Sequence, residues 1–163
     1  MKKEEEVLVA LRRIIRAVDI QSRKLMKISG LTGPQLMIMQ AIDKLGDVTI
    51  GSIARHANLS QATVTSILDR LVKRGLVIRT RSESDKRVVH AQLTSEGQMS
   101  LEQAPTLFQD DFMQCFQKLK DWEQSQIISS VQRLAEMMDA EEIEAMPVLE
   151  IAPVSPGDEN GML

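Results

Sequence analysis

The stretch at residues 48–77, "VTIGSIARHANLSQATVTSILDRLVKRGLV", constrains the fold more than any other part of the chain. Thr49 and Ser60 each precede an amphipathic run, as helix N-cap residues do, because a hydroxyl can accept a hydrogen bond from the first turn. The "HANLS" stretch between the runs allows only a tight turn, and Gly75 ends the second helix. Two short helices, a turn of about three or four residues and small residues such as Ala54 at their crossing are typical of a helix-turn-helix motif.

A β-hairpin is predicted directly after this motif. Residues 77–81 and 86–93 are rich in β-branched side chains, alternate in part, and are separated by the polar sequence "SESD". A long amphipathic helix at residues 4–29 and a second helix from Thr32 to Gly46, opened by a capping box, precede the motif. The fold class is therefore mostly α-helical with a small β-hairpin wing.

The chain becomes helical again after Thr94, but Pro105 lies inside the helical pattern and should kink it near Ala104 or split it in two. Asp121 is predicted to cap a last helix, with Gln124 three residues later. We expect a winged helix-turn-helix domain flanked by helices at both ends.

The charge distribution points to a polyanionic partner, although the whole chain carries a net charge of -3. Between Ser52 and His90, eight basic residues stand against three acidic ones, a net charge of +5. From Leu134 onward there are eight acidic residues and no Lys or Arg. Such a segmental excess of positive charge favours binding to nucleic acid.

The outer face of the second short helix has the small and polar side chains that a DNA major groove admits. Its candidate DNA-binding residues are Ser60, Gln61, Ala62, Thr63, Thr65, Ser66, Arg70 and Lys73. An ordinary solvated helix face is the alternative interpretation. The hairpin favours DNA, because basic side chains at its tip can reach an adjacent minor groove. The candidate wing residues are Arg81, Ser82, Lys86 and Arg87.

The hairpin also supports a resemblance. "DKRVVHAQLTSEG" fits the pattern D-x-R-x-x-x-x-x-L-T-x-x-G, and together with the preceding "LSQATVTSILDRLVKRGLVIR" it resembles the wing and recognition helix of the MarR family of bacterial regulators. The resemblance extends over roughly Leu8 to Asp139. It implies a homodimer in which each subunit presents a recognition helix and a wing to half of a palindromic operator in double-stranded DNA. It also implies that Asp85 orders the wing by pairing with neighbouring basic groups and that Arg87 contacts DNA.

Within this family, "EVLVALRRIIRAVD" and "GLTGPQL" are similar to regulators of compatible-solute genes, such as ectoine operons. The resemblance implies a repressor whose affinity for DNA responds to a small-molecule effector or an osmotic signal, bound between the dimerisation helices and the winged domain. A winged-helix protein-interaction module that does not read DNA is the alternative function.

The expected organisation has four parts: a dimerisation helix (1–31), the winged helix-turn-helix DNA-binding domain (32–97), C-terminal dimerisation helices (98–140) and an acidic tail (141–163) that is disordered or loosely docked. The apolar stripes of the first and last helices cannot both be buried in so small a winged domain, so two chains should pair through them. The predicted dimerisation residues are Val7, Leu11, Ile14, Val18, Ile127, Val131, Leu134 and Met138.

Catalysis, cofactors and metals are not expected. The sequence has no nucleophile next to a base, no glycine-rich phosphate loop and no catalytic carboxylate pair, and His56 and His90 lack nearby Cys or His partners. Cys115 is expected to be a small buried core residue, and as the single cysteine it cannot form an intramolecular disulfide. No run approaches the roughly 20 apolar residues of a membrane helix. We expect a cytoplasmic protein with no membrane contact.

Overall fold

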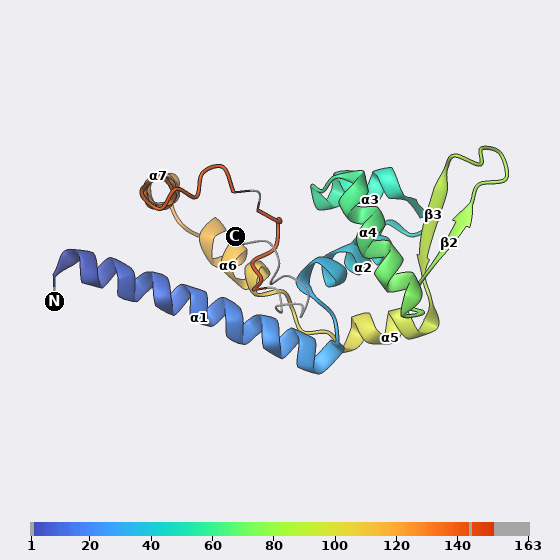
Figure 1. Ribbon diagram of the computed structural model, residues 1–163, viewed down its shortest axis with the longest axis horizontal. Coiled ribbons are helices and arrows are strands. Elements are labelled where there is room, and N and C mark those ends of the chain that lie inside the picture. The colour runs from blue at the N-terminus through green and yellow to red at the C-terminus, as the bar shows by residue number, and fades with distance from the viewer. Residues whose placement is uncertain (1, 144, 152–163) are drawn as a thin grey trace, which may run out of the picture.

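The computed structural model describes residues 2–143 and 145–151, and within these ranges the chain forms seven α-helices and one three-stranded antiparallel sheet (Figure 1). Helix α1 (Lys3–Ser29) runs along one side of the molecule. The helix-turn-helix lies near its C-terminal end and the hairpin projects beyond that end, while α6 lies over the middle of α1 and α7 over its N-terminal half. We call α1, α6 and α7 the helical arm, and residues 31–94 the winged unit.

The helices of the winged unit begin where the sequence predicts, because their caps are local. Helix α2 (Gly33–Leu45) opens with a capping box in which Thr32 Oγ1 accepts from Gln35 N–H and Gln35 Oε1 accepts from Thr32 N–H at 3.1 Å. Helix α3 (Ile50–Ala57) is capped by Thr49. Helix α4 (Gln61–Lys73) is the second helix of the motif and follows the N-cap Ser60.

The sheet contains the predicted hairpin and a strand that the sequence analysis missed. Strands β2 (Val77–Arg81) and β3 (Val89–Leu93) pair antiparallel, with Arg79 opposite Ala91. Strand β1 (Val48–Thr49) pairs with the other edge of β3, giving the order β1-β3-β2. The prediction that the second strand begins at residue 86 was wrong, because residues 82–88 form the wing turn, closed by a hydrogen bond from Ser82 N–H to Val88 O.

The hydrophobic core is centred in the winged unit, where α2, α3 and α4 pack together and against the sheet, and it also takes in Leu25, Leu107 and Val148. Its almost fully buried large side chains are Leu31, Leu36, Ile38, Met39, Ile42, Ile53, Val64, Leu68, Leu71 and Val77. The C-terminal end of α4 is joined to the α1–α2 corner by Arg74, which donates from Nη1 to Gly30 O at 2.6 Å. These contacts fix the direction in which α4 presents its outer face.

Pro105 splits the helix that follows the sheet, which is one of the two outcomes that the sequence predicts. Helix α5 (Ser95–Gln103) ends before it, and α6 (Phe108–Gln117) begins after it. Helix α7 (Asp121–Met137) starts one residue earlier than expected. Asp121 is not its cap: the N-cap is Lys120, whose N–H donates to Glu123 Oε2 at 2.8 Å, so the reciprocal contact comes from Glu123 instead of Gln124.

The helical arm leaves much of its apolar surface exposed. Neither α6 nor α7 contains a buried residue. The prediction that Cys115 is buried was wrong for the single subunit, because its helix, α6, packs too loosely to cover it. None of the described helices is long and apolar enough to cross a membrane.

Candidate nucleic-acid interface

Helix α4 is oriented by its buried side. Val64, Leu68 and Leu71 have no measurable exposure, so the opposite side of the helix must face solvent. Most of the predicted recognition residues are exposed: Ser60, Gln61, Ala62, Ser66, Arg70 and Lys73. Thr63 and Thr65 are half-buried.

The hydroxyls at the start of α4 are partly used within the helix. Ser60 Oγ accepts from Thr63 N–H at 3.1 Å and lies 2.7 Å from Thr63 Oγ1. Thr65 Oγ1 donates to Gln61 O at 2.8 Å. The Gln61 amide and the Ser66 hydroxyl are therefore the exposed polar groups best placed to meet base edges in a groove.

The wing, at the end of the β2–β3 hairpin, projects from the rest of the winged unit (Figure 1). Arg81, Lys86 and Arg87 are exposed there, and among the described residues none of the three forms an ion pair. Ser82 is half-buried, and its Oγ accepts from Asp85 N–H at 3.4 Å. The tip thus carries three cationic side chains free to meet phosphates.

Asp85 forms two hydrogen bonds with the backbone of the wing turn. Its Oδ1 accepts from Arg87 N–H at 2.9 Å, and its carbonyl oxygen accepts from Val88 N–H at 2.9 Å. This is the geometry of an Asx turn, in which an aspartate side chain bonds the backbone two residues later. The resemblance implies pairing with basic groups instead, but Asp85 has no ion pair in the part of the chain that the structure describes.

The recognition helix and the wing border one open hollow with a volume of about 310 Å³. Its lining comes from Gln61 and Thr65 of α4, from residues 49–51 at the start of α3, and from Arg87, Val88 and Val89 of the hairpin. Side chains that are more than 20 residues apart in the sequence therefore form one continuous surface. A groove-reading helix and a phosphate-binding wing need this arrangement in order to contact one duplex together.

Two positioning contacts were missed by the sequence analysis. Arg79 on β2 donates from Nη2 to Asp69 Oδ1 on α4, which ties the wing to the recognition helix. His90 Nδ1 on β3 lies 3.1 Å from Asp47 Oδ1, at the base of the sheet. Neither pair has a signal in the sequence, because the partners are brought together only by the tertiary fold.

This geometry agrees with comparisons to known proteins. Residues 31–89 match the profile of the MarR family. The chain is 30% identical over 129 residues to the uncharacterized HTH-type transcriptional regulator YsmB of Bacillus subtilis (strain 168), an alignment that covers 79% of this chain and 88% of that relative. The chain belongs to the MarR family. Members of this family are transcription regulators, which confirms the prediction that the chain is not an enzyme.

Solved structures share the fold of this MarR-family chain. A MepR-like protein complexed with pseudoligands superposes with a TM-score of 0.59 at 24% identity, covering 85% of this chain and 97% of that one. Reduced AbfR bound to DNA superposes with a TM-score of 0.51 at 25% identity, covering 83% and 94%. The predicted fold class, a mostly helical winged helix-turn-helix with flanking helices, is confirmed.

Among the described residues, no group of three or more His, Cys, Asp or Glu side chains is placed to hold a metal ion.

Proposed function

We propose that this chain is a cytoplasmic repressor that binds a palindromic operator in double-stranded DNA as a homodimer. The observation that carries the proposal is the continuous surface shared by α4 and the wing, where Gln61 and Arg87 line the same hollow. In this proposal the exposed face of α4 reads base edges, while Arg81, Lys86 and Arg87 contact phosphates or the minor groove. The DNA-bound structure of the related AbfR supports it.

The direct test is a gel shift with the DNA upstream of the chain's own gene, set against an unrelated duplex of the same length. We expect retention of the upstream DNA at salt concentrations that release the unrelated duplex, because base contacts add to the phosphate contacts common to both. Failure to retain either duplex at low salt would instead favour the protein-interaction module.

The exposed apolar surface of the helical arm supports the proposed homodimer. Ile14 is 58% exposed, Val131 is 58% exposed and Trp122 is 62% exposed, and isolated subunits rarely leave so many large apolar side chains in water. Most of the predicted dimerisation residues are accessible: Val7, Leu11, Ile14, Ile127, Val131, Leu134 and Met138. Val18 is only 7% exposed, so we leave it out of the proposed interface.

Static light scattering at micromolar concentration should therefore return twice the 18.3 kDa mass of one chain. Ile14→Asp with Val131→Asp should shift the mass toward a single chain, since a charge at each position would be buried in the interface. A mass of one chain for the unaltered protein would contradict the dimer.

A second prediction concerns Asp85 and its effect on operator binding. Asp85→Ala should weaken operator binding although it makes the surface more positive, because the Arg87 N–H loses its acceptor and the wing turn loosens. Asp85→Asn should retain most of the affinity, since an amide oxygen can accept the same hydrogen bond. Operator titrations of both variants measure this. Tighter binding by Asp85→Ala would show that Asp85 is only a repelling charge.

A small-molecule or osmotic signal is proposed to control DNA binding, in keeping with the resemblance to regulators of compatible-solute genes. A thermal-shift screen of osmolytes, phenolic acids and antibiotics tests this, because a ligand that binds only the folded protein raises its melting temperature. A hit that also changes the gel shift would be the effector.

A further inference from the structure

The end of the described chain returns to the C-terminal half of α1. Residues 146–151, which we call the C-terminal strap, leave the region of α7 and descend between α6 and the winged unit (Figure 1). The strap lies within the segment that the sequence predicts to be disordered or loosely docked. It nonetheless forms specific contacts with three separate helices.

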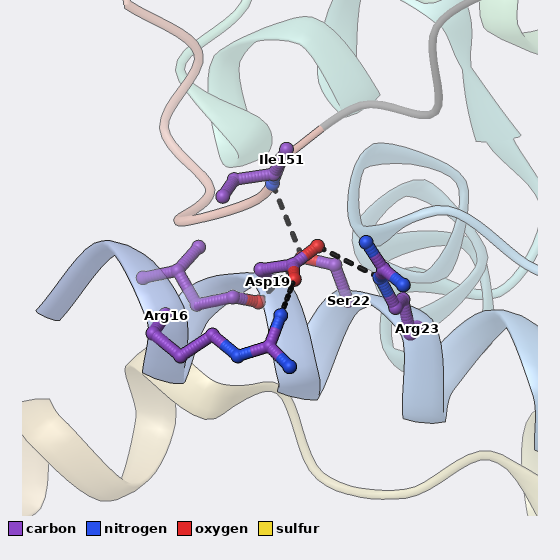
Figure 2. Close-up of polar contacts among 6 residues, drawn as sticks. Arg16, Asp19, Ser22, Arg23 and Ile151 are labelled. Carbon is purple, nitrogen blue, oxygen red and sulfur yellow. Dashed lines mark hydrogen bonds and ion pairs between the residues drawn. The ribbon is translucent and has the colours of Figure 1, made fainter. Parts of the chain in front are cut away.

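Three hydrogen bonds fix the backbone and the carboxylate of the strap. Leu149 N–H donates to Gln109 Oε1 of α6 at 3.1 Å. Glu150 Oε1 accepts from the N–H of Gly33, the first residue of α2, at 2.7 Å. Ile151 N–H donates to Ser22 Oγ of α1 at 3.1 Å, beside the Arg16–Asp19–Arg23 cluster (Figure 2). The strap thereby links α6 with α1 and α2.

Val148 is the apolar anchor of the strap. It is 8% exposed and belongs to the hydrophobic core, although its neighbour Leu149 is 50% exposed. Its Cγ1 occupies the space next to Gly33, where a Cβ would come within 2.5 Å. Only a glycine at position 33 allows this close approach without a shift of the strap.

The strap fills a hollow between the arm and the winged unit. The walls are Ser22 and Leu25 of α1, Gly33 of α2, and the α5–α6 connection with Pro105 and Leu107. With the strap in place the remaining cavity has a volume of about 20 Å³, room for about one water molecule. Without Val148 and Glu150 the site would be an open hollow at the N-terminus of α2, lined by apolar side chains such as Leu25 and Leu107 and by polar ones such as Ser22 and Thr106.

The strap presents the same groups as an organic anion with an apolar body: the carboxylate of Glu150 and the buried side chain of Val148. The carboxylate of Glu150 accepts from the first turn of α2, where the helix dipole favours negative charge. Burial raises the pKa of the Glu150 carboxyl above its usual range, and the hydrogen bond from Gly33 N–H opposes that rise.

We propose that the C-terminal strap is an internal ligand, which occupies the hollow between α1, α2 and the α5–α6 connection and excludes small apolar anions from it. The inference concerns contacts within one chain, so it stands or falls independently of operator binding. An external anion with an apolar body has to displace the strap before it can bind there.

The test uses the full-length protein and the apolar anionic dye 1-anilinonaphthalene-8-sulfonate. Val148→Ser should bind the dye about tenfold more tightly than the unaltered protein, because burial of a Val side chain is worth at least a tenfold change in an equilibrium. Met146→Ser is the matched control: its side chain is 42% exposed and does not line the hollow, so dye binding should stay unchanged. A peptide of residues 145–151 should displace the dye from Val148→Ser.

Equal dye binding by Val148→Ser and the unaltered protein, or failure of the peptide to compete, would overturn the proposal. Because dye also binds loosened proteins, a second experiment tests docking without it. In a Cys115→Ser background, Ser22→Cys with Ile151→Cys should form an intramolecular disulfide on mild oxidation, since Ser22 Oγ and Ile151 N are 3.1 Å apart. A chain that remains reduced, or that crosslinks only between subunits, would show that the strap does not dock.

Discussion

Arg87→Ala is expected to weaken operator binding by about 1 to 3 kcal/mol while leaving the dimer mass and the melting temperature nearly unchanged. The guanidinium of Arg87 is exposed at the wing and forms no ion pair among the described residues, so its removal breaks no ion pair within the protein. The backbone N–H that bonds Asp85 is retained in the variant. The loss should therefore appear in DNA binding alone.

The salt dependence of binding shows whether Arg87 neutralises a phosphate. Each neutralised phosphate contributes a slope of roughly -0.9 in log K against log salt, so removing one such phosphate partner from each subunit should reduce the slope of the dimer by about two units. Operator titrations at several salt concentrations measure this. Lys118→Ala is the control, because it removes the same charge between α6 and α7, away from the wing. An equal change of slope in both variants would mean that only net charge matters.

The parts of the fold that could be predicted from the sequence depend on local interactions. The N-caps Thr32, Thr49 and Ser60 each bond a backbone N–H within three residues, so the order of residues already specifies the hydrogen bond. Strand β1 could not be predicted, because two residues have no periodicity and this strand exists only through its pairing with β3. The docking of Val148 depends on Gly33, which lies far earlier in the chain.

In the candidate site, too, the features set by local sequence could be predicted and those set by the tertiary fold could not. The exposure of Gln61 and Arg87 follows from helical period and from the position of a turn, and both could be predicted. The Arg79–Asp69 pair could not, because it depends on how β2 crosses α4. The backbone contact of Asp85 is a different case: an aspartate two residues before a free N–H is a recognisable Asx-turn signal, and the resemblance led the interpretation toward ion pairing instead.

The second large effect is expected from Gly97→Ala, at the last position of the pattern that the hairpin shares with its family. A Cβ at residue 97 would overlap the carbonyl oxygen of Leu76 and would lie 3.0 Å from its carbonyl carbon. Both atoms belong to the backbone, so no side-chain rotation can relieve the overlap. The start of α5 would have to move away from the end of α4.

That movement would break a connected set of hydrogen bonds. Thr94 N–H donates to Leu76 O at 3.0 Å, Thr94 Oγ1 donates to Gly75 O at 2.6 Å, and the same Oγ1 accepts from Gly97 N–H at 3.0 Å. These bonds hold the N-terminus of α5 against the turn that joins the recognition helix to the wing. We expect Gly97→Ala to lower the free energy of unfolding by about 3 kcal/mol, the upper end of the cost of overpacking a rigid site.

Gly51→Ala is the matched control for this prediction, since it adds the same methyl group to another glycine of the winged unit. Its nearest neighbour there would be Gln61 Nε2 at 3.5 Å, an ordinary contact with a movable side chain, and residue 51 lies in the first turns of α3. Alanine is favoured over glycine in a helix by up to about 1 kcal/mol, so this variant should unfold at an equal or higher urea concentration than the unaltered protein. Equal urea midpoints for the two variants would refute the backbone overlap at Leu76, and with it the structural reason for a glycine at position 97.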